Sequence, residues 1–188
     1  MYTEDKIFEP ADIAEIIFQQ SEFENCTFNE CDFTNADFSN SSFVECSFNN
    51  CNISLVKLTS TTFHDVKFSG CKMLGLIFHD CSKFGLSFKF DNCTLNHSSF
   101  YQTKIAKTIF DNCTLQDVDF TASDLAGAVF NNCDLLNAKF ENTILEKSDF
   151  RTAYNYSINP ELNKIKKAIF SLAGIRGLLE KYNIIIQE

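Results

Sequence analysis

The sequence has few of the residues that divide a chain into domains. Only two prolines occur, Pro10 and Pro160, and the six glycines are scattered. No Pro-, Gly- or Ser-rich linker is present, so we expect one domain of 188 residues. No apolar run approaches the roughly 18 residues of a membrane span. Residues 1–10 carry three acids and no apolar run, which argues against a secretory signal. We therefore expect a soluble, cytoplasmic protein without a membrane partner.

The residues and motifs of enzyme and metal sites are also scarce. The three histidines, His64, His79 and His97, have no Ser, Cys or carboxylate partner in the pattern. No glycine-rich phosphate-binding motif occurs. The nine cysteines form no C-x-x-C pair, so neither a zinc site nor a disulfide framework is indicated. We predict a protein that is not an enzyme and that carries no cofactor or metal.

The abundant residue is phenylalanine, which recurs with a period of five. Neither a helix, with period 3.6, nor a strand, with period 2, produces this spacing. A fixed short repeat instead indicates a solenoid whose units bury their apolar sides against stacked neighbours. Of the 21 phenylalanines, all but Phe84 and Phe90 lie on the period. The large residues are Phe8, Ile13, Phe18, Phe23, Phe28, Phe33, Phe38, Phe43, Phe48, Ile53, Leu58, Phe63, Phe68, Met73, Phe78 and Phe88, then Leu95, Phe100, Ile105, Phe110, Leu115, Phe120, Leu125, Phe130, Leu135, Phe140, Leu145 and Phe150.

A smaller residue usually precedes each large one by two positions, and the remaining positions are mostly polar. This pattern fits a narrow tube filled by side chains. Residues 91–95 and 111–115 both read DNCTL, and residues 131–135 read NNCDL, so four units close one coil of 20 residues. A two-residue bulge in the region 83–90 shifts the register. With that shift, the pattern predicts one buried column of reduced cysteines, in which thiols act as small hydrophobes: Cys31, Cys51, Cys71, Cys93, Cys113 and Cys133.

These features resemble the pentapeptide-repeat family, whose consensus is roughly A-(D/N)-L-x-x. Residues 11–15 read ADIAE and residues 123–127 read SDLAG, both close to that consensus. The match spans about residues 6–155. The resemblance implies an all-β fold, a right-handed four-sided parallel β-helix of about 7–8 coils. We expect the β-helix over residues 1–170 and a C-terminal segment over residues 171–188.

The two ends resemble the Qnr and MfpA quinolone-resistance proteins of that family. Residues 5–8 read DKIF, as at the start of Qnr proteins, and the tail is similar in order to theirs. We expect a helix near residues 171–182 and a short strand at the apolar residues 184–186. The helix has an apolar stripe that caps the open tube end, which a solenoid must cover. The resemblance further implies that this stripe is a homodimer interface, formed by Leu172, Ile175, Leu178 and Leu179.

The charge is acidic overall, at −9, and uneven along the chain. Residues 1–56 hold 11 acids and one base, a net of −10, whereas residues 57–110 hold three acids and seven lysines, a net of +4. All 17 acids from Glu22 to Asp149 fall at outward positions of the repeat. Stacked carboxylates can present a line of negative charge comparable to that of duplex DNA. Acidic outward positions also serve simply to keep a rod soluble.

The resemblance implies a DNA-mimicking protein that binds type II topoisomerases, DNA gyrase or topoisomerase IV, and protects them from quinolones. It would not bind nucleic acid directly. The chain departs from Qnr proteins, which project a long and a shorter loop, because it has room only for a two-residue bulge. The alternative is a rigid scaffold that binds another protein partner through one flat face. The candidate partner contacts are Glu22, Glu24, Glu30, Asp32, Asp37 and Glu45.

Overall fold

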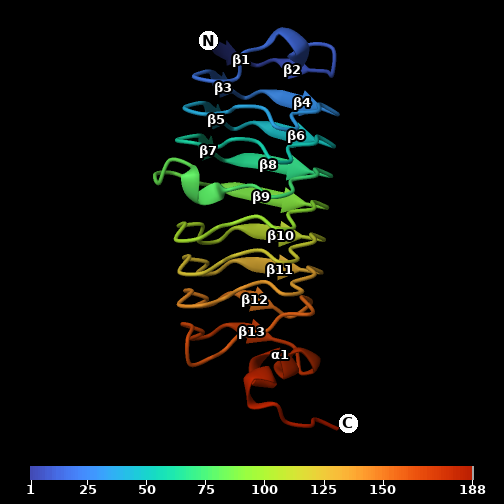
Figure 1. Cartoon of the computed structure of the whole chain (residues 1–188), viewed down its shortest axis with the longest axis vertical. Coiled ribbons are helices and arrows are strands. Elements are labelled where there is room, and N and C mark those ends of the chain that lie inside the picture. The colour runs from blue at the N-terminus through green and yellow to red at the C-terminus, as the bar shows by residue number, and fades with distance from the viewer. Residues whose placement is uncertain (188) are drawn as a thin grey trace.

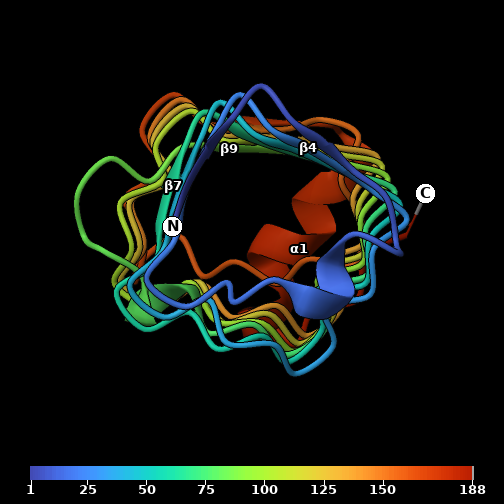
Figure 2. The same ribbon diagram turned by 90° about the horizontal axis from the view of Figure 1, so that it is seen from above.

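The computed structural model describes residues 1–187, which form one rod of stacked coils (Figure 1). Seen along the rod in Figure 2, each coil passes through four sides, and about eight turns follow one another. Every strand pair among the described residues is parallel. The right-handed four-sided parallel β-helix predicted from the sequence is confirmed.

Short strands mark two of the four sides. We call the outer surface of the four-stranded sheet and its continuation in later coils the first face, and that of the nine-stranded sheet the second face. The four-stranded sheet joins β1 (Tyr2–Glu4), β3 (Glu22–Glu24), β5 (Ser42–Val44) and β7 (Thr62–His64). The nine-stranded sheet joins β2 (Ile7–Phe8), β4 (Thr27–Asn29), β6 (Ser47–Asn49), β8 (Val66–Ser69), β9 (Phe88–Asp91), β10 (Ile109–Asp111), β11 (Val129–Asn131), β12 (Asp149–Phe150) and β13 (Ile169–Phe170).

The other two sides, the third and fourth faces, are held by isolated parallel bridges such as Asp32↔Asn52 and Asp37↔Lys57. Bridges also continue the first face beyond its sheet, through Lys104↔Asp124 and Ile144↔Lys164. Two short 3-10 helices interrupt the coils, at Ile13–Glu15 and Phe78–Asp80. Paired residues are 20 apart, or 22 apart across the bulge, which confirms four units per coil.

A ladder of nine phenylalanine rings lies behind the second face. Neighbouring rings stack with centroids 4.7–5.3 Å apart, which matches the roughly 4.8 Å between paired strands. The parallel register therefore places identical side chains directly above one another. The members of the ladder are Phe8, Phe28, Phe48, Phe68, Phe90, Phe110, Phe130, Phe150 and Phe170.

The predicted cysteine column is present, and all nine cysteines are free and buried. All thiols in the column except that of Cys113 donate to the carbonyl oxygen of the ladder phenylalanine one coil earlier. Cys51 Sγ lies 3.3 Å from Phe28 O, and Cys71 Sγ lies 3.3 Å from Phe48 O. Cysteine fills the narrow corner and also satisfies a backbone acceptor, so its repetition is explained by packing.

Most corners of the tube are turned by a residue in the left-handed region, two positions after the large inward residue. The φ angle of the non-glycine corner residues ranges from 48° to 64°. Asparagine and aspartate tolerate this conformation better than other non-glycine residues. Asn92, Asn112 and Asn132 occupy one corner column, and Asn132 Nδ2 donates to Asn112 Oδ1 at 3.1 Å. The asparagine column therefore has a structural role in turning the chain.

Residues 83–86 form the bulge, which projects from the rod below β7 (Figure 1). Ser82 N donates to Thr61 O and Ser87 N donates to Phe63 O, so the two extra residues lie between these serines. The bulge ends the four-stranded sheet because no strand can pair beneath β7.

The register around the bulge corrects two sequence assignments. Phe90, placed off the period, is a fully buried member of the ladder. Phe88, placed on the period as a large inward residue, pairs with Val66 in the column of smaller residues. Its ring centroid lies 5.8 Å from that of Phe63. The physical reason is that the bulge leaves the first face without a large inward residue in this coil, and Phe88 fills the space.

The C-terminal segment folds over the last coil (Figure 1). It consists of a 3-10 turn at Ala173–Ile175, helix α1 at Arg176–Leu179 and a second 3-10 turn at Glu180–Tyr182. The helix predicted near residues 171–182 is therefore present, mostly as 3-10 turns. The short strand predicted at residues 184–186 is wrong, because residues 183–187 are irregular after a left-handed turn at Asn183.

Candidate interaction surfaces

Three of the six carboxylates proposed as partner contacts lie together on the first face. Glu22 and Glu24 point outward from β3, and Glu45 is exposed at the corner after β5. Glu24 is in register with Glu4 of β1 and accepts a hydrogen bond of 2.8 Å from the Tyr2 hydroxyl. This hydrogen bond to a carboxylate raises the pKa of Tyr2.

The other three lie on different sides of the rod. Glu30 is at the corner between the second and third faces, Asp32 is on the third face and Asp37 on the fourth. Asp37 pairs with Lys57, with Oδ2 and Nζ 3.3 Å apart. Hydrogen bonds from residue 34 lower the pKa of Asp32, and those from residue 39 lower the pKa of Asp37. The six residues therefore do not form one surface.

Sequence reasoning missed three carboxylates that do join the first group. Glu4 lies beside Glu24, Asp5 accepts a hydrogen bond of 2.6 Å from Asn25 Nδ2, and Asp65 occupies the same corner column as Glu45. The missing signal was the 20-residue column, which places residues 5, 25, 45 and 65 above one another. We call the following six exposed residues of the first four coils the acidic patch: Glu4, Asp5, Glu22, Glu24, Glu45 and Asp65.

Beyond the bulge the same face becomes basic. We call the following six exposed lysines on the first face and its corner the basic half: Lys104, Lys107, Lys147, Lys164, Lys166 and Lys167. Two acids, Asp124 and Glu146, lie among them. Within residues 1–187, none of these six ammonium groups forms an ion pair.

A groove beside the bulge adds further positive charge. It encloses about 380 Å³ and is lined by Lys67, Lys89 and Lys107 together with Asp65 and Phe88. Lys67 and Lys89 are in register on adjacent strands, where two like charges repel each other. This groove is suited to an anionic group.

The four residues of the predicted dimer interface do not share one environment, since some are exposed and others face the end of the tube. Leu172 is 87% exposed and Ile175 is 40% exposed, whereas Leu178 packs against the core of the tube. Leu179 lines a groove of about 720 Å³ between α1 and the last coils. The stripe therefore serves partly as the cap, and only Leu172 and Ile175 are exposed.

Tyr156 explains the two glycines of the C-terminal segment. A Cβ at Gly177 would lie 2.2 Å from Tyr156 O, and one at Gly174 would lie 2.1 Å from the Tyr156 hydroxyl. The backbone also approaches closely here, since Ile158 N donates to Gly177 O at 2.9 Å. Glycine has a lower helix propensity than alanine, but at these two positions it allows the C-terminal segment to pack closely on the end of the tube.

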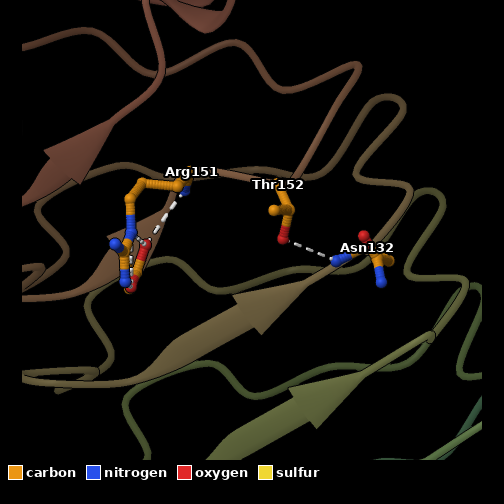
Figure 3. A network of polar contacts seen from close by, with 4 residues as sticks. Asn132, Arg151 and Thr152 are labelled. Atoms are coloured by element: carbon orange, nitrogen blue, oxygen red, sulfur yellow. Dashed lines mark hydrogen bonds and ion pairs between the residues drawn. The ribbon is translucent and has the colours of Figure 1, made fainter.

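Elsewhere on the surface, polar side chains form hydrogen bonds and ion pairs with neighbouring residues of the rod. In Figure 3, Arg151 holds the Asp149 carboxylate with Nη2 2.6 Å from Oδ2, and Asn132 N donates to the Thr152 hydroxyl at 2.9 Å. The Arg151 contact lowers the pKa of Asp149. Among the described residues, no three His, Cys, Asp or Glu side chains converge on a common metal position. No helix within residues 1–187 is long and apolar enough to span a membrane.

Comparison with known proteins agrees with this architecture. Two trypsin-treated variants of QnrB1, a plasmid-mediated fluoroquinolone resistance protein, superpose over all of this chain. One gives a TM-score of 0.63 at 15% identity over 98% of its own length, and the other gives 0.64 at 13% identity over 99%. Identities this low show a shared fold alone. No curated protein sequence matches significantly. The family model for the pentapeptide repeat region matches residues 21–89 and 78–150, so this chain belongs to the pentapeptide-repeat family.

Proposed function

We propose that this protein is a non-enzymatic DNA mimic that occupies the DNA-binding surface of a type II topoisomerase, DNA gyrase or topoisomerase IV. Quinolone protection of that enzyme is part of the proposal. The observation that carries it is the acidic patch, six exposed carboxylates at one end of a rod whose fold is shared with QnrB1. Fold alone does not assign function, so the charge arrangement is the physical argument.

The charge density of the patch supports mimicry. Six carboxylates over four coils of about 4.8 Å each give roughly one negative charge per 3.2 Å, about half the linear charge density of duplex DNA, which carries one per about 1.7 Å. The patch lies at the N-terminal end, whereas the basic half would be repelled by a cationic surface. We therefore expect the first four coils to make the contact.

The test is a gyrase and topoisomerase IV assay that measures supercoiling or relaxation, DNA binding and quinolone-stabilised cleavage. We expect wild-type protein to compete with DNA, and its effect to weaken as salt shortens the Debye length. A variant with Glu22→Gln, Glu24→Gln, Glu45→Gln and Asp65→Asn should lose most of that effect. The matched control removes four charges from other faces: Glu30→Gln, Asp91→Asn, Asp111→Asn and Glu141→Gln.

Two outcomes would reject the proposal. If a large excess of wild-type protein leaves all three readouts unchanged for both enzymes, the topoisomerase is not the partner. If patch and control variants lose the same activity, net charge rather than the patch is responsible. Neither variant alters a buried side chain, so circular dichroism should show the same thermal unfolding as wild type.

A second candidate function is a rigid scaffold that binds an acidic protein partner. The observation that favours it is the groove beside the bulge, which is lined by three lysines, Lys67, Lys89 and Lys107, and by one acid. A scaffold of this kind would lose its partner with Lys67→Gln and Lys89→Gln but keep it with the acidic-patch variant. The two candidate functions therefore respond in opposite ways to the same pair of variants.

We also propose a homodimer joined end to end through the C-terminal segment. Its contacts are Leu172 and Ile175, since large exposed apolar side chains beside a tube end favour association. Leu172→Glu with Ile175→Glu should give monomers in sedimentation velocity. Leu178→Glu is not an equivalent test, because Leu178 packs against the core and its charge would detach the cap. Wild-type protein that is monomeric at micromolar concentration would reject this dimer.

A further inference from the structure

The first face changes sign at the middle of the rod. Before the bulge, the acidic patch contributes six negative charges. After it, six lysines of the basic half outweigh Asp124 and Glu146, for a net of +4. The bulge coil is the fifth of nine in the phenylalanine ladder, since Phe90 has four ladder members on each side. The bulge projects near the middle of the rod (Figure 1), so opposite charges lie on either side of it.

The bulge presents an exposed aromatic ring beside one exposed lysine, Lys83. Phe84 is 86% exposed, and it is the only exposed phenylalanine in residues 1–187. An added Cβ at Gly85 would have no atom within 4 Å apart from its chain neighbours, so no other residue of 1–187 covers this position of the bulge. An exposed aromatic ring flanked by charge is typical of the centre of a protein contact.

We propose that two copies of this chain associate side by side and antiparallel through their first faces, with the two bulges in contact on the two-fold axis. A two-fold axis at the fifth coil places the fourth coil of one copy opposite the sixth of the other, the third opposite the seventh, the second opposite the eighth and the first opposite the ninth. Every contact between residue i and residue j is then made twice, as in other isologous pairs. The charge reversal along the face is the arrangement that such an axis requires.

The coil numbers give specific pairs. Asp65 in the fourth coil faces Lys104 and Lys107 in the sixth, and Glu4 and Asp5 in the first coil face the ninth. The ninth coil carries three lysines of the basic half. Two pairings are unfavourable, because Glu45 in the third coil faces Asp124 in the seventh, and Glu24 in the second faces Glu146 in the eighth. Long lysine and glutamate side chains can reach across the space that the two projecting bulges leave between the faces.

This association is independent of the proposed topoisomerase function and distinct from the end-to-end dimer. It buries the acidic patch of both copies, so any cationic partner of that patch competes with it. Exposed ion pairs are weak and screened by salt, and only one aromatic side chain per copy is buried. The pair should therefore be weak and should dissociate as salt rises.

The first experiment separates the two modes of association by shape. A Leu172→Glu, Ile175→Glu protein removes the end contact and leaves the first face unchanged. At about 10 mM salt, where the Debye length is about 30 Å, sedimentation should show dimers, and at about 1 M, where it is about 3 Å, monomers. Small-angle scattering should give a dimer about as long as one protomer, roughly 40 Å, rather than roughly 80 Å.

The decisive experiment exchanges charges between two variants in that same background. One carries Glu4→Lys and Asp5→Lys, and the other carries Lys164→Glu, Lys166→Glu and Lys167→Glu. Each alone faces like charges across the axis, so each should self-associate about tenfold more weakly than the parent. Mixed together, they face opposite charges at both ends and should form a one-to-one heterodimer with the parent's affinity.

A third experiment tests the contact of Phe84 at the centre of the proposed interface. Phe84→Ser should weaken the low-salt dimer, whereas Ile17→Ser, which alters an exposed apolar side chain on the fourth face, should not. The proposal is overturned if the parent stays monomeric at low salt and high protein concentration. It is equally overturned if the two charge variants associate alone as well as they do together. Neither outcome bears on the topoisomerase assay.

Discussion

Phe130 and Phe84 carry the same side chain in opposite environments. Phe130 is fully buried in the ladder, with stacked neighbours 5.0 Å and 4.7 Å away, and Phe84 is 86% exposed. The period of five places Phe130 inside, and the register shift places Phe84 in the bulge. The cost of truncating each ring is therefore set by its position in the repeat.

We predict that Phe130→Ala lowers the free energy of unfolding by about 3–5 kcal/mol, because it leaves a cavity in a close-packed tube. Phe84→Ala, the matched control, should change it by less than about 0.5 kcal/mol. Urea unfolding followed by far-UV circular dichroism measures both. Phe130→Asp should not fold, since no partner is available for a buried charge. Equal losses for the two alanine variants would contradict the buried ladder.

The thiols give a prediction about alkaline pH. Burial raises the pKa of Cys31 and of Cys46 to about 12, from 9.0 in the unfolded chain. As pH rises above about 9, the unfolded chain loses these protons first, so the folded state loses stability between pH 9 and about 12. We expect the urea midpoint to fall over this range. In Cys31→Ser with Cys46→Ser the fall should be smaller, and an identical fall would show that other groups cause it.

The five-residue period predicts which residues are inside wherever the repeat is uninterrupted. It fails at Phe88 and Phe90, because the sequence shows that two residues are inserted but not where the chain leaves the tube. The spacing places Phe88 on the period, whereas in the structure its side chain fills the space next to the Phe63 ring. The register there depends on three-dimensional fit rather than on spacing.

At the scale of elements, the cap illustrates the same limit. The apolar stripe of residues 172–179 predicted a helix correctly, yet stripe membership does not say which residues contact the tube. The helix is rotated so that Gly177 meets Tyr156 and Leu178 meets the core, which leaves Leu172 exposed. Residues 184–186 are strongly apolar but have no strand to pair with in residues 1–187, so they form no strand.

We predict that Gly177→Ala detaches the cap although alanine favours helix by about 1 kcal/mol. The added methyl would overlap Tyr156 O at 2.2 Å, and backbone cannot move away cheaply. Limited trypsin digestion should cut after Arg176 and Lys181 faster in this variant than in wild type. Glu180→Ala, an exposed change in the same segment, is the control. Unchanged cleavage in Gly177→Ala would contradict the close contact.

At the scale of the whole molecule, a net charge summed along the sequence combines residues that lie on four different faces. The net of −10 in residues 1–56 is real, but consecutive acids such as Glu30, Asp32 and Asp37 point in different directions. Residues share a face when they lie in the same short strand or about 20 positions apart. The acidic patch and basic half become visible once the coil length is combined with the position of the bulge.

The final prediction concerns the open end of the rod. Tyr156 and Ile158 are buried at this end and Phe170 is half-buried, and the C-terminal segment contacts the end through Leu178 and the Ile158–Gly177 hydrogen bond. A chain ending at residue 170 should keep its strand content but expose β13 as an unpaired edge. We expect it to aggregate, with light scattering that rises with protein concentration. Full-length Leu172→Glu with Ile175→Glu, which keeps the cap and removes only the exposed apolar contacts, should stay dispersed. If the truncated chain also stays dispersed and unfolds at the same temperature, residues 171–187 are not the cap, and the tube end must be protected by the last coil alone.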